Sequence, residues 1–103
     1  MSRFIAVARA DEIPPGTGRP FNVEGKPVAL FNVGGTFHAI DGVCLHRGGP
    51  VGEGDLEDTT VTCPWHGWQY DVTTGANVLD PAIGLTTHET RVEDGVVLVA
   101  LAG

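Results

Sequence analysis

The sequence is short of basic residues, and this shortage limits the partners it can bind. Six lysines and arginines stand against thirteen aspartates and glutamates in 103 residues, which gives a formal net charge of −7. Nucleic-acid binding needs a basic face to neutralise phosphates, so we exclude that class, and docking to an anionic membrane is disfavoured for the same reason. The charge favours steering toward a partner with a positive patch, as short-lived redox complexes often require. The alternative interpretation is that the surplus carboxylates only maintain solubility, which would give the same net charge.

Long apolar segments are also missing. The longest apolar run, residues 96–102, is far shorter than the roughly 20 residues that a membrane-spanning helix needs. Residues 1–10 contain two arginines and too short an apolar stretch for a secretory signal. We therefore expect a soluble, cytoplasmic protein, whose only two cysteines remain thiols that can bind metal.

Helical periodicity is scarce, whereas turn residues are plentiful. Fifteen glycines and seven prolines are spread without a repeat, which indicates tight turns between short strands. Gly34-Gly35 and Asp94-Gly95 each predict a hairpin turn, because glycine tolerates a positive φ angle, and Glu24-Gly25 indicates a third turn. Runs rich in β-forming residues predict strands at 4–8, 28–33, 36–40, 59–63, 68–72, 85–92 and 96–101, with one helical turn at 10–13. The prediction is a single domain, residues 1–103, with eight or nine strands in an all-β antiparallel sandwich or small barrel.

Two short segments hold both cysteines and half of the histidines. The first begins Cys44-Leu45-His46 and the second begins Cys63-Pro64-Trp65-His66; flanking glycines and prolines predict that both are tight loops. Sixteen residues separate His46 from Cys63, which is enough for a strand pair to bring the loops together. Two thiolates and two imidazoles form a complete four-ligand set, and nearby glycines allow backbone N–H groups to approach the negatively charged sulfurs of an iron–sulfur cluster.

Other interpretations of these four residues remain open at this point. A structural zinc site uses the same ligands, but zinc modules usually group Cys with Cys and His with His, unlike the mixed pairs here. A disulfide between Cys44 and Cys63 leaves both histidines unexplained and suits an oxidising compartment. Simple burial of all four side chains as core residues is the third alternative.

The spacing C-x-H, sixteen residues, C-x-x-H resembles the Rieske proteins and Rieske-type ferredoxins, and the likeness covers most of the chain. The resemblance implies a subdomain in which two loops bind one [2Fe-2S] cluster. Cys44 and Cys63 would bind the inner iron, and His46 and His66 the outer one. Neutral imidazoles in place of two thiolates lower the negative charge of the cluster and raise its reduction potential. No catalytic residue is implied, so we predict an electron-transfer protein and not an enzyme.

Three further positions distinguish the branches of that family. Gly49 and Trp65 stand where respiratory Rieske proteins carry a loop-locking disulfide, and Trp68 stands where those proteins have a serine that donates to a bridging sulfide. Both differences favour a low-potential ferredoxin without a membrane anchor. Tyr70 matches a tyrosine of the high-potential branch, and we hypothesise that its hydroxyl reaches the sulfur of Cys44. The alternative is a half-buried strand tyrosine whose hydroxyl lies in water.

Apolar residues near the motifs predict a docking site. Residues 79–84 resemble the proline-containing loop that covers the cluster in this family. We expect an apolar collar around the ligand histidines, formed by Leu45, Pro64, Trp65 and Pro81. For Trp65, packing beneath the loops is the alternative, and Arg47 is either a docking residue or a solvated loop charge. His38 and His88 are expected to be ordinary strand residues.

We predict a soluble one-electron carrier, monomeric, with no nucleic-acid or membrane partner. The resemblance implies transient contact with a flavoprotein NAD(P)H reductase, which supplies electrons, and with a terminal oxygenase of a dioxygenase system, which receives them. The rival interpretation is a small Rieske-like subunit of an assimilatory nitrite reductase. A zinc-stabilised interaction module is the third.

Overall fold

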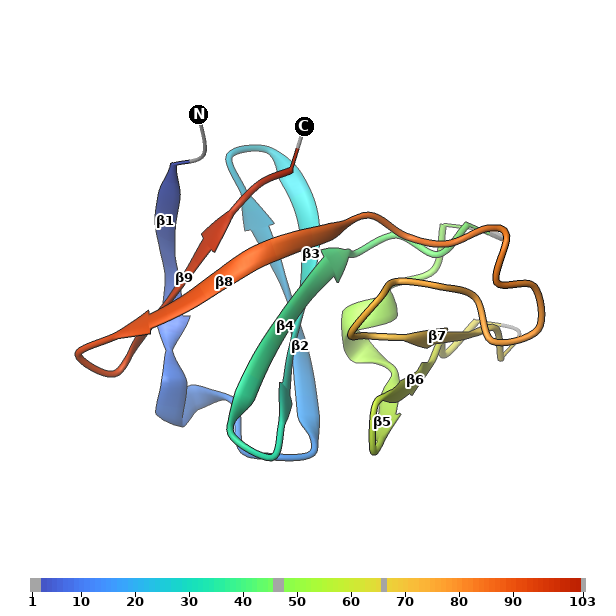
Figure 1. Cartoon of the computed structure of the whole chain (residues 1–103), viewed down its shortest axis with the longest axis horizontal. Coiled ribbons are helices and arrows are strands. Elements are labelled where there is room, and N and C mark those ends of the chain that lie inside the picture. Colours follow the sequence, from blue (N-terminus) through green and yellow to red (C-terminus); the bar gives the residue numbers. More distant parts are fainter. Residues whose placement is uncertain (1–2, 46–47, 66, 103) are drawn as a thin grey trace.

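Two antiparallel sheets make up the fold in the computed structural model, which describes residues 3–45, 48–65 and 67–102 (Figure 1). The larger sheet has the order β1-β9-β8-β4-β3-β2, and the smaller one has the order β5-β6-β7. The strands of the larger sheet are β1 (Phe4–Arg9), β2 (Thr17–Val23), β3 (Lys26–Val33), β4 (Thr36–Asp41), β8 (Thr87–Glu93) and β9 (Val96–Ala100). The smaller sheet contains β5 (Asp55–Glu57), β6 (Thr60–Thr62) and β7 (Gln69–Asp71). Two 3-10 turns, Ala10–Glu12 and Val51–Glu53, complete the regular structure of the described residues.

The three predicted turns are confirmed, and all three close hairpins. Glu24-Gly25 joins β2 to β3, Gly34-Gly35 joins β3 to β4, and Asp94-Gly95 joins β8 to β9. All six of these residues have φ between 51° and 98°, the range that a two-residue turn needs to match the twist of the flanking strands. The register of three strand pairs therefore follows from local sequence.

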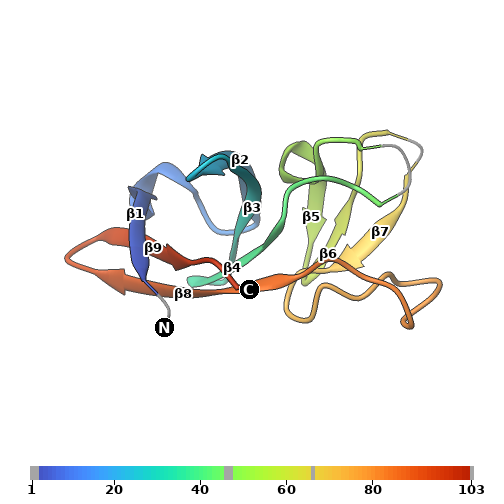
Figure 2. The same cartoon turned by 90° about the horizontal axis from the view of Figure 1, so that it is seen from above.

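The larger sheet curls on itself, so that its two outermost strands, β1 and β2, approach each other (Figure 2). The predicted all-β, barrel-like fold is confirmed, although two strands were not predicted. In β2, Gly18 and Pro20 weaken the strand pattern; proline is tolerated there because β2 is an edge strand. The other missed strand, β5, is short and acidic and leaves little apolar signal.

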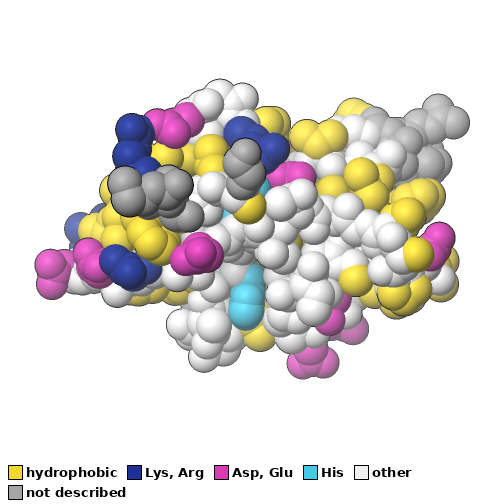
Figure 3. All heavy atoms as spheres, turned by 45° about the horizontal axis from the view of Figure 1, so that its top comes forward, with side chains coloured by type: hydrophobic (Ala, Val, Ile, Leu, Met, Phe, Trp, Pro, Cys, Tyr) yellow, Lys and Arg dark blue, Asp and Glu magenta, His cyan; other side chains and the backbone are white. Residues whose placement is uncertain are grey.

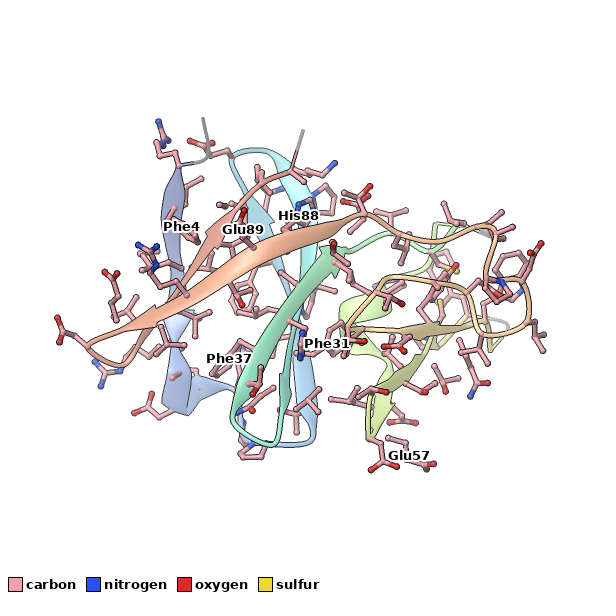
Figure 4. All side chains as sticks on the ribbon, viewed as in Figure 1. Phe4, Phe31, Phe37, Glu57, His88 and Glu89 are labelled. Carbon is pink, nitrogen blue, oxygen red and sulfur yellow. The ribbon has the colours of Figure 1, made fainter. Side chains whose placement is uncertain are left out.

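Strand β3 is buried on both faces, which explains its unbroken apolar run. Val28 and Leu30 face one core, which lies inside the curled sheet with residues such as Phe37. Ala29 and Phe31 face a second core, which this strand shares with the smaller sheet (Figure 4). Because each face packs against a different core, the usual alternation of apolar and polar residues is absent. The second core contains both cysteines.

Residues 42–86 form the region between the end of β4 and the start of β8, and they carry the smaller sheet (Figure 1). The chain thus leaves the larger sheet once and returns once. Both predicted metal-binding loops fall within this excursion. Within the described ranges, we find no helix with the length and apolar character needed to cross a membrane.

Candidate metal centre

Two similar loops carry the cysteines. In the first, the N–H of Cys44 donates to the carbonyl of Gly49 at 2.9 Å; in the second, the N–H of Cys63 donates to the carbonyl of Trp68 at 2.7 Å. Each loop therefore starts at its cysteine and is closed by a backbone hydrogen bond five residues later. Both cysteine side chains are buried, and no disulfide joins them, which contradicts the disulfide alternative.

The loops touch at Gly49. A Cβ atom at this position would lie 2.8 Å from the Sγ of Cys63 and 2.9 Å from the Cβ of Trp65, both too close for a real side chain. Glycine is thus required where the first loop passes the second. Gly49 and Trp65, the two positions that carry a disulfide in the other branch of the family, are neighbours in space.

Tyr70 lies on β7, is completely buried and reaches the first loop. Its hydroxyl oxygen is 3.3 Å from the Sγ of Cys44 and accepts the backbone N–H of Leu45 at 3.2 Å. The hypothesis drawn from the sequence is confirmed, and the alternative of a hydroxyl in water is wrong. A thiolate ligand has no proton to give, so with Cys44 bound to iron the hydroxyl of Tyr70 is the donor. Burial, followed by the contact with Cys44, raises the pKa of Tyr70 to about 12, so its O–H is retained at neutral pH.

The Cys63 thiol, like that of Cys44, is buried and has a hydrogen-bond donor. Burial raises its pKa; a hydrogen bond with the backbone N–H of Trp65 opposes this rise, and the neighbouring Cys44 side chain adds to it. The two sulfurs therefore lie close to each other, and each has a hydrogen-bond donor. Bound metal would offset the cost of burying thiolates here, because a metal ligand is deprotonated on binding.

The two predicted histidine ligands, His46 and His66, lie outside the described residues, as does Arg47. Within the described part of the chain, no group of three or more metal-ligating side chains is found. His38 and His88 are strand residues as predicted. Because His88 is paired with Ala39, the residue after His38, the two imidazoles project from opposite faces of the sheet and cannot form one site.

Asn77 is a site residue that was not predicted. Its buried side chain accepts the backbone N–H groups of Leu79 and Asp80, each at 3.0 Å, and also contacts the hydroxyl of Tyr70. It thus ties the proline-containing loop to the residue that supports Cys44. The available signal was an asparagine three residues before Asp80-Pro81, a pattern typical of an Asx turn.

All four residues of the predicted collar are exposed. Leu45 and Trp65 expose about half of their surface, so Trp65 is not buried beneath the loops. Pro64 and Pro81 are exposed as well. Leu79, in the proline-containing loop, is 93% exposed and borders a hollow of about 370 Å³ together with Trp68 and Ile83. Figure 3 shows hydrophobic side chains at the end of the molecule that holds the smaller sheet.

These features fit an iron–sulfur cluster. Two adjacent thiols are unbridged, each has a donor directed at its sulfur, and a side chain is excluded where the loops meet. The donors suit a group whose sulfur atoms carry negative charge.

Comparison with known proteins agrees with this chemistry. A sequence profile of the Rieske [2Fe-2S] domain matches residues 3–89. The ferredoxin subunit of 3-phenylpropionate/cinnamic acid dioxygenase from Escherichia coli (strain K12) is 40% identical over 104 residues, covering 98% of this chain and 95% of that protein.

Solved structures give the same result. A chain in the complex of reduced oxygenase and oxidized ferredoxin of carbazole 1,9a-dioxygenase is 34% identical with a TM-score of 0.86, and the match covers 94% of this chain and 92% of that one. A chain from Mycobacterium tuberculosis assigned to the small subunit of an NADH-dependent nitrite reductase has a TM-score of 0.91 over 100% of this chain and 98% of that one. At 23% identity it shows the fold alone.

The relatives with the higher identities are ferredoxins of dioxygenase systems, so the predicted electron-carrier class is confirmed. The predicted cofactor, a Rieske-type [2Fe-2S] cluster, is confirmed by the matching profile. This chain belongs to the Rieske [2Fe-2S] domain family.

Proposed function

We propose that this carrier takes single electrons from a flavoprotein NAD(P)H reductase and passes them to the terminal oxygenase of a dioxygenase system. The observation that carries the proposal is the likeness, over nearly the whole chain, to ferredoxins of such systems, one of them solved together with its oxygenase. The nitrite reductase rival is supported only by a shared fold. We further propose that residues 1–103 form one Rieske domain that acts as a cytoplasmic monomer.

Four ligands are proposed for the cluster: Cys44 and Cys63 for the inner iron, His46 and His66 for the outer iron. The two cysteines support this set, because they are adjacent, buried and unbridged. When bound, the cluster supplies a site that gains and loses one electron. Tyr70 and the backbone N–H of Trp65 hold hydrogen bonds to the cysteine sulfurs, and these bonds become stronger as negative charge increases there.

Metal analysis tests the ligand set. Purified protein is expected to contain two iron and two sulfide per chain, with a red-brown colour; one zinc and no colour would contradict the proposal. His46→Asn and His66→Asn are expected to lose the cluster. The matched control is His38→Asn, because His38 is a half-buried strand histidine of the larger sheet and should keep the full iron content.

The proposed docking face consists of the collar (Leu45, Pro64, Trp65 and Pro81) together with Leu79. It is apolar and exposed, and it lies in the region that carries the ligand loops. An apolar face of this small size suits brief contact with a redox partner, whereas permanent interfaces are usually larger.

Electron transfer tests the route. Leu79→Asp is expected to lower the second-order rate of electron transfer to the oxygenase by roughly 10-fold, the effect of losing about 1.4 kcal/mol of contact, while the midpoint potential stays unchanged. The matched control is Val92→Asp, because Val92 is also an exposed apolar residue, 46% exposed, but lies on β8 in the larger sheet. Equal rates in the two variants would exclude the proposed face. Stable co-purification with a large haem-bearing subunit would favour the nitrite reductase rival.

A further inference from the structure

Asp41 and His88 meet where the chain crosses between the two sheets. Asp41 is the last residue of β4, where the chain leaves the larger sheet, and His88 is the second residue of β8, where the chain has returned. The Nε2 of His88 lies 2.9 Å from the Oδ1 of Asp41, and the backbone N–H of Asp41 donates to the carbonyl of Thr86 at 2.9 Å. These contacts join the outgoing strand to the incoming strand; Figure 4 labels His88 on β8.

The tautomer of His88 follows from its second contact. The backbone N–H of Ala102 points at the Nδ1 of His88 at 2.9 Å, and a backbone N–H can only donate. The Nδ1 atom is therefore an acceptor, so the proton lies on Nε2 and is donated to Asp41. The imidazole side chain is fully buried, and both of its nitrogens are used. His88 is thus a neutral, oriented donor rather than half of a surface ion pair.

Asp41 also lies close to the first metal-binding loop. Its Oδ1 receives a second contact, from the Nζ of Lys26 at 3.4 Å. Asp41 and Lys26 line a hollow of about 420 Å³, and Cys44 and Leu45 of the first loop line the same hollow. Only Gly42 and Val43 separate Asp41 from Cys44 in the chain.

Gly42 makes this short connection rigid. Its N–H donates to the carbonyl of Pro27 at 3.0 Å, and a Cβ atom added to it would lie 3.0 Å from the backbone nitrogen of Val28. The chain is therefore packed directly against β3 at this point. A displacement of Asp41 would pass to Cys44 because the link between them has little freedom to absorb it.

We propose that Asp41 and His88 are positioning residues: their hydrogen bond holds the first ligand loop in the geometry that binds the cluster. The proposal rests on Cys44 as a ligand, and so on the proposed function. The side chain of His88 supplies the fixed donor, Asp41 carries the constraint across Gly42, and the bond from Ala102 keeps the imidazole in the required tautomer. Groups that orient metal ligands without touching the metal commonly change metal affinity when they are removed.

Four variants of the cluster-loaded protein test this inference. His88→Phe and Asp41→Ala remove the bond, and each is expected to lose iron to a chelator on the order of 10-fold faster than the wild type. The g values of the reduced protein in electron paramagnetic resonance are expected to shift as well. Asp41→Asn keeps an oxygen that can accept from Nε2, so it should retain iron as the wild type does. Thr90→Val is the matched control, because Thr90 donates from the same strand to the carbonyl of Phe37 on β4 at 2.7 Å, farther along the strand pair from the first loop.

The outcomes separate a positioning role from a purely structural one. If His88→Phe and Asp41→Ala lower thermal stability but match Thr90→Val in iron loss and g values, the inference is overturned. It is also overturned if Asp41→Asn loses iron as fast as Asp41→Ala, since the hydrogen bond would then not be the cause. If Asp41→Ala does not fold, the iron loss and g values of His88→Phe are compared with those of Thr90→Val, and this comparison alone tests the inference. A wild-type protein without iron would refute the proposed function. A wild-type protein that contains iron, with variants that lose it no faster, would refute only this inference.

Discussion

The larger sheet and the region of residues 42–86 are built in different ways. Strands of the larger sheet have five to eight residues and are mostly joined by tight two-residue turns, whereas each strand of the smaller sheet has three residues. Such short strands bury little area of their own and need a partner surface to be stable. Region 42–86 obtains that surface from one face of β3 and from the core around its two cysteines. The larger sheet acts as a scaffold, and the smaller sheet depends on that scaffold for its stability.

The two parts also differ in surface chemistry. Region 42–86 has six acidic residues and one arginine, while the rest of the chain has seven acidic and five basic residues. Of the seven large hydrophobic residues found exposed among the described ones, six belong to region 42–86. Region 42–86 therefore carries a net charge of −5 out of −7, together with six of the seven exposed large hydrophobic residues among the described ones. This combination suits a long-range approach guided by charge and a short-lived apolar contact.

The largest expected effect comes from removing a proposed ligand. Cys63→Ser is expected to abolish cluster binding, as measured by iron and sulfide content. If region 42–86 depends on the cluster, hydrogen exchange at the amides of β5, β6 and β7 should then become about 100-fold faster. This is the stabilisation that a bound ligand gives when its concentration is about 100 times its Kd. The amides of β3 and β9 should keep their protection. Equal loss of protection in both sheets would show that the scaffold does not fold independently of the metal site.

The next-largest effect is expected from substituting two adjacent residues of β3, one in each core. Leu30 faces the core of the larger sheet and Phe31 faces the core that holds the cysteines; both are fully buried. Leu30→Ala and Phe31→Ala are each expected to lower the free energy of unfolding by about 2–5 kcal/mol, measured by denaturant titration. Only Phe31→Ala should also speed the loss of iron. A faster loss of iron in Leu30→Ala as well would mean that the two cores act as one.

The same division explains which features the sequence could predict. The hairpins at Gly34-Gly35 and Asp94-Gly95 were predictable, because the required positive φ is a property of the turn residues themselves. The contact between Tyr70 and Cys44 was predictable only through the family resemblance. The bond between Asp41 and His88 spans 47 positions in the chain and leaves no local pattern. Strand β2 was missed because Gly18 and Pro20 suit an edge strand that packs over Phe31, a context that only the folded chain supplies.

Tyr70 is expected to give a smaller but specific effect. Its hydroxyl stabilises negative charge on the Cys44 sulfur, and that charge increases on reduction, so Tyr70→Phe should lower the midpoint potential. A loss of about 1 kcal/mol corresponds to roughly 40 mV for one electron. The matched control is Thr62→Val, because Thr62 accepts a hydrogen bond from the side chain of Gln69 at 3.1 Å. Gln69 precedes Tyr70 on β7, so this hydrogen bond lies on the opposite face of the smaller sheet. A potential unchanged in Tyr70→Phe, or lowered equally in Thr62→Val, would remove Tyr70 from the control of the potential.

Two glycines, one from each region, give a final comparison. Gly35 in a hairpin of the larger sheet and Gly67 in the second ligand loop have φ of 98° and 75°, and neither has an atom within 4 Å of an added Cβ. Substitution by alanine therefore introduces backbone strain without a clash, about 1–2 kcal/mol in each case. Both variants should show a similar loss of stability in thermal unfolding, but only Gly67→Ala should change the visible spectrum and the rate of iron loss. The strain in Gly35→Ala falls on a turn that no ligand shares, whereas Gly67 follows the proposed ligand His66. If the two variants keep identical spectra, the second loop tolerates strain as well as a solvent-exposed hairpin does, and its geometry is set by the metal rather than by the chain.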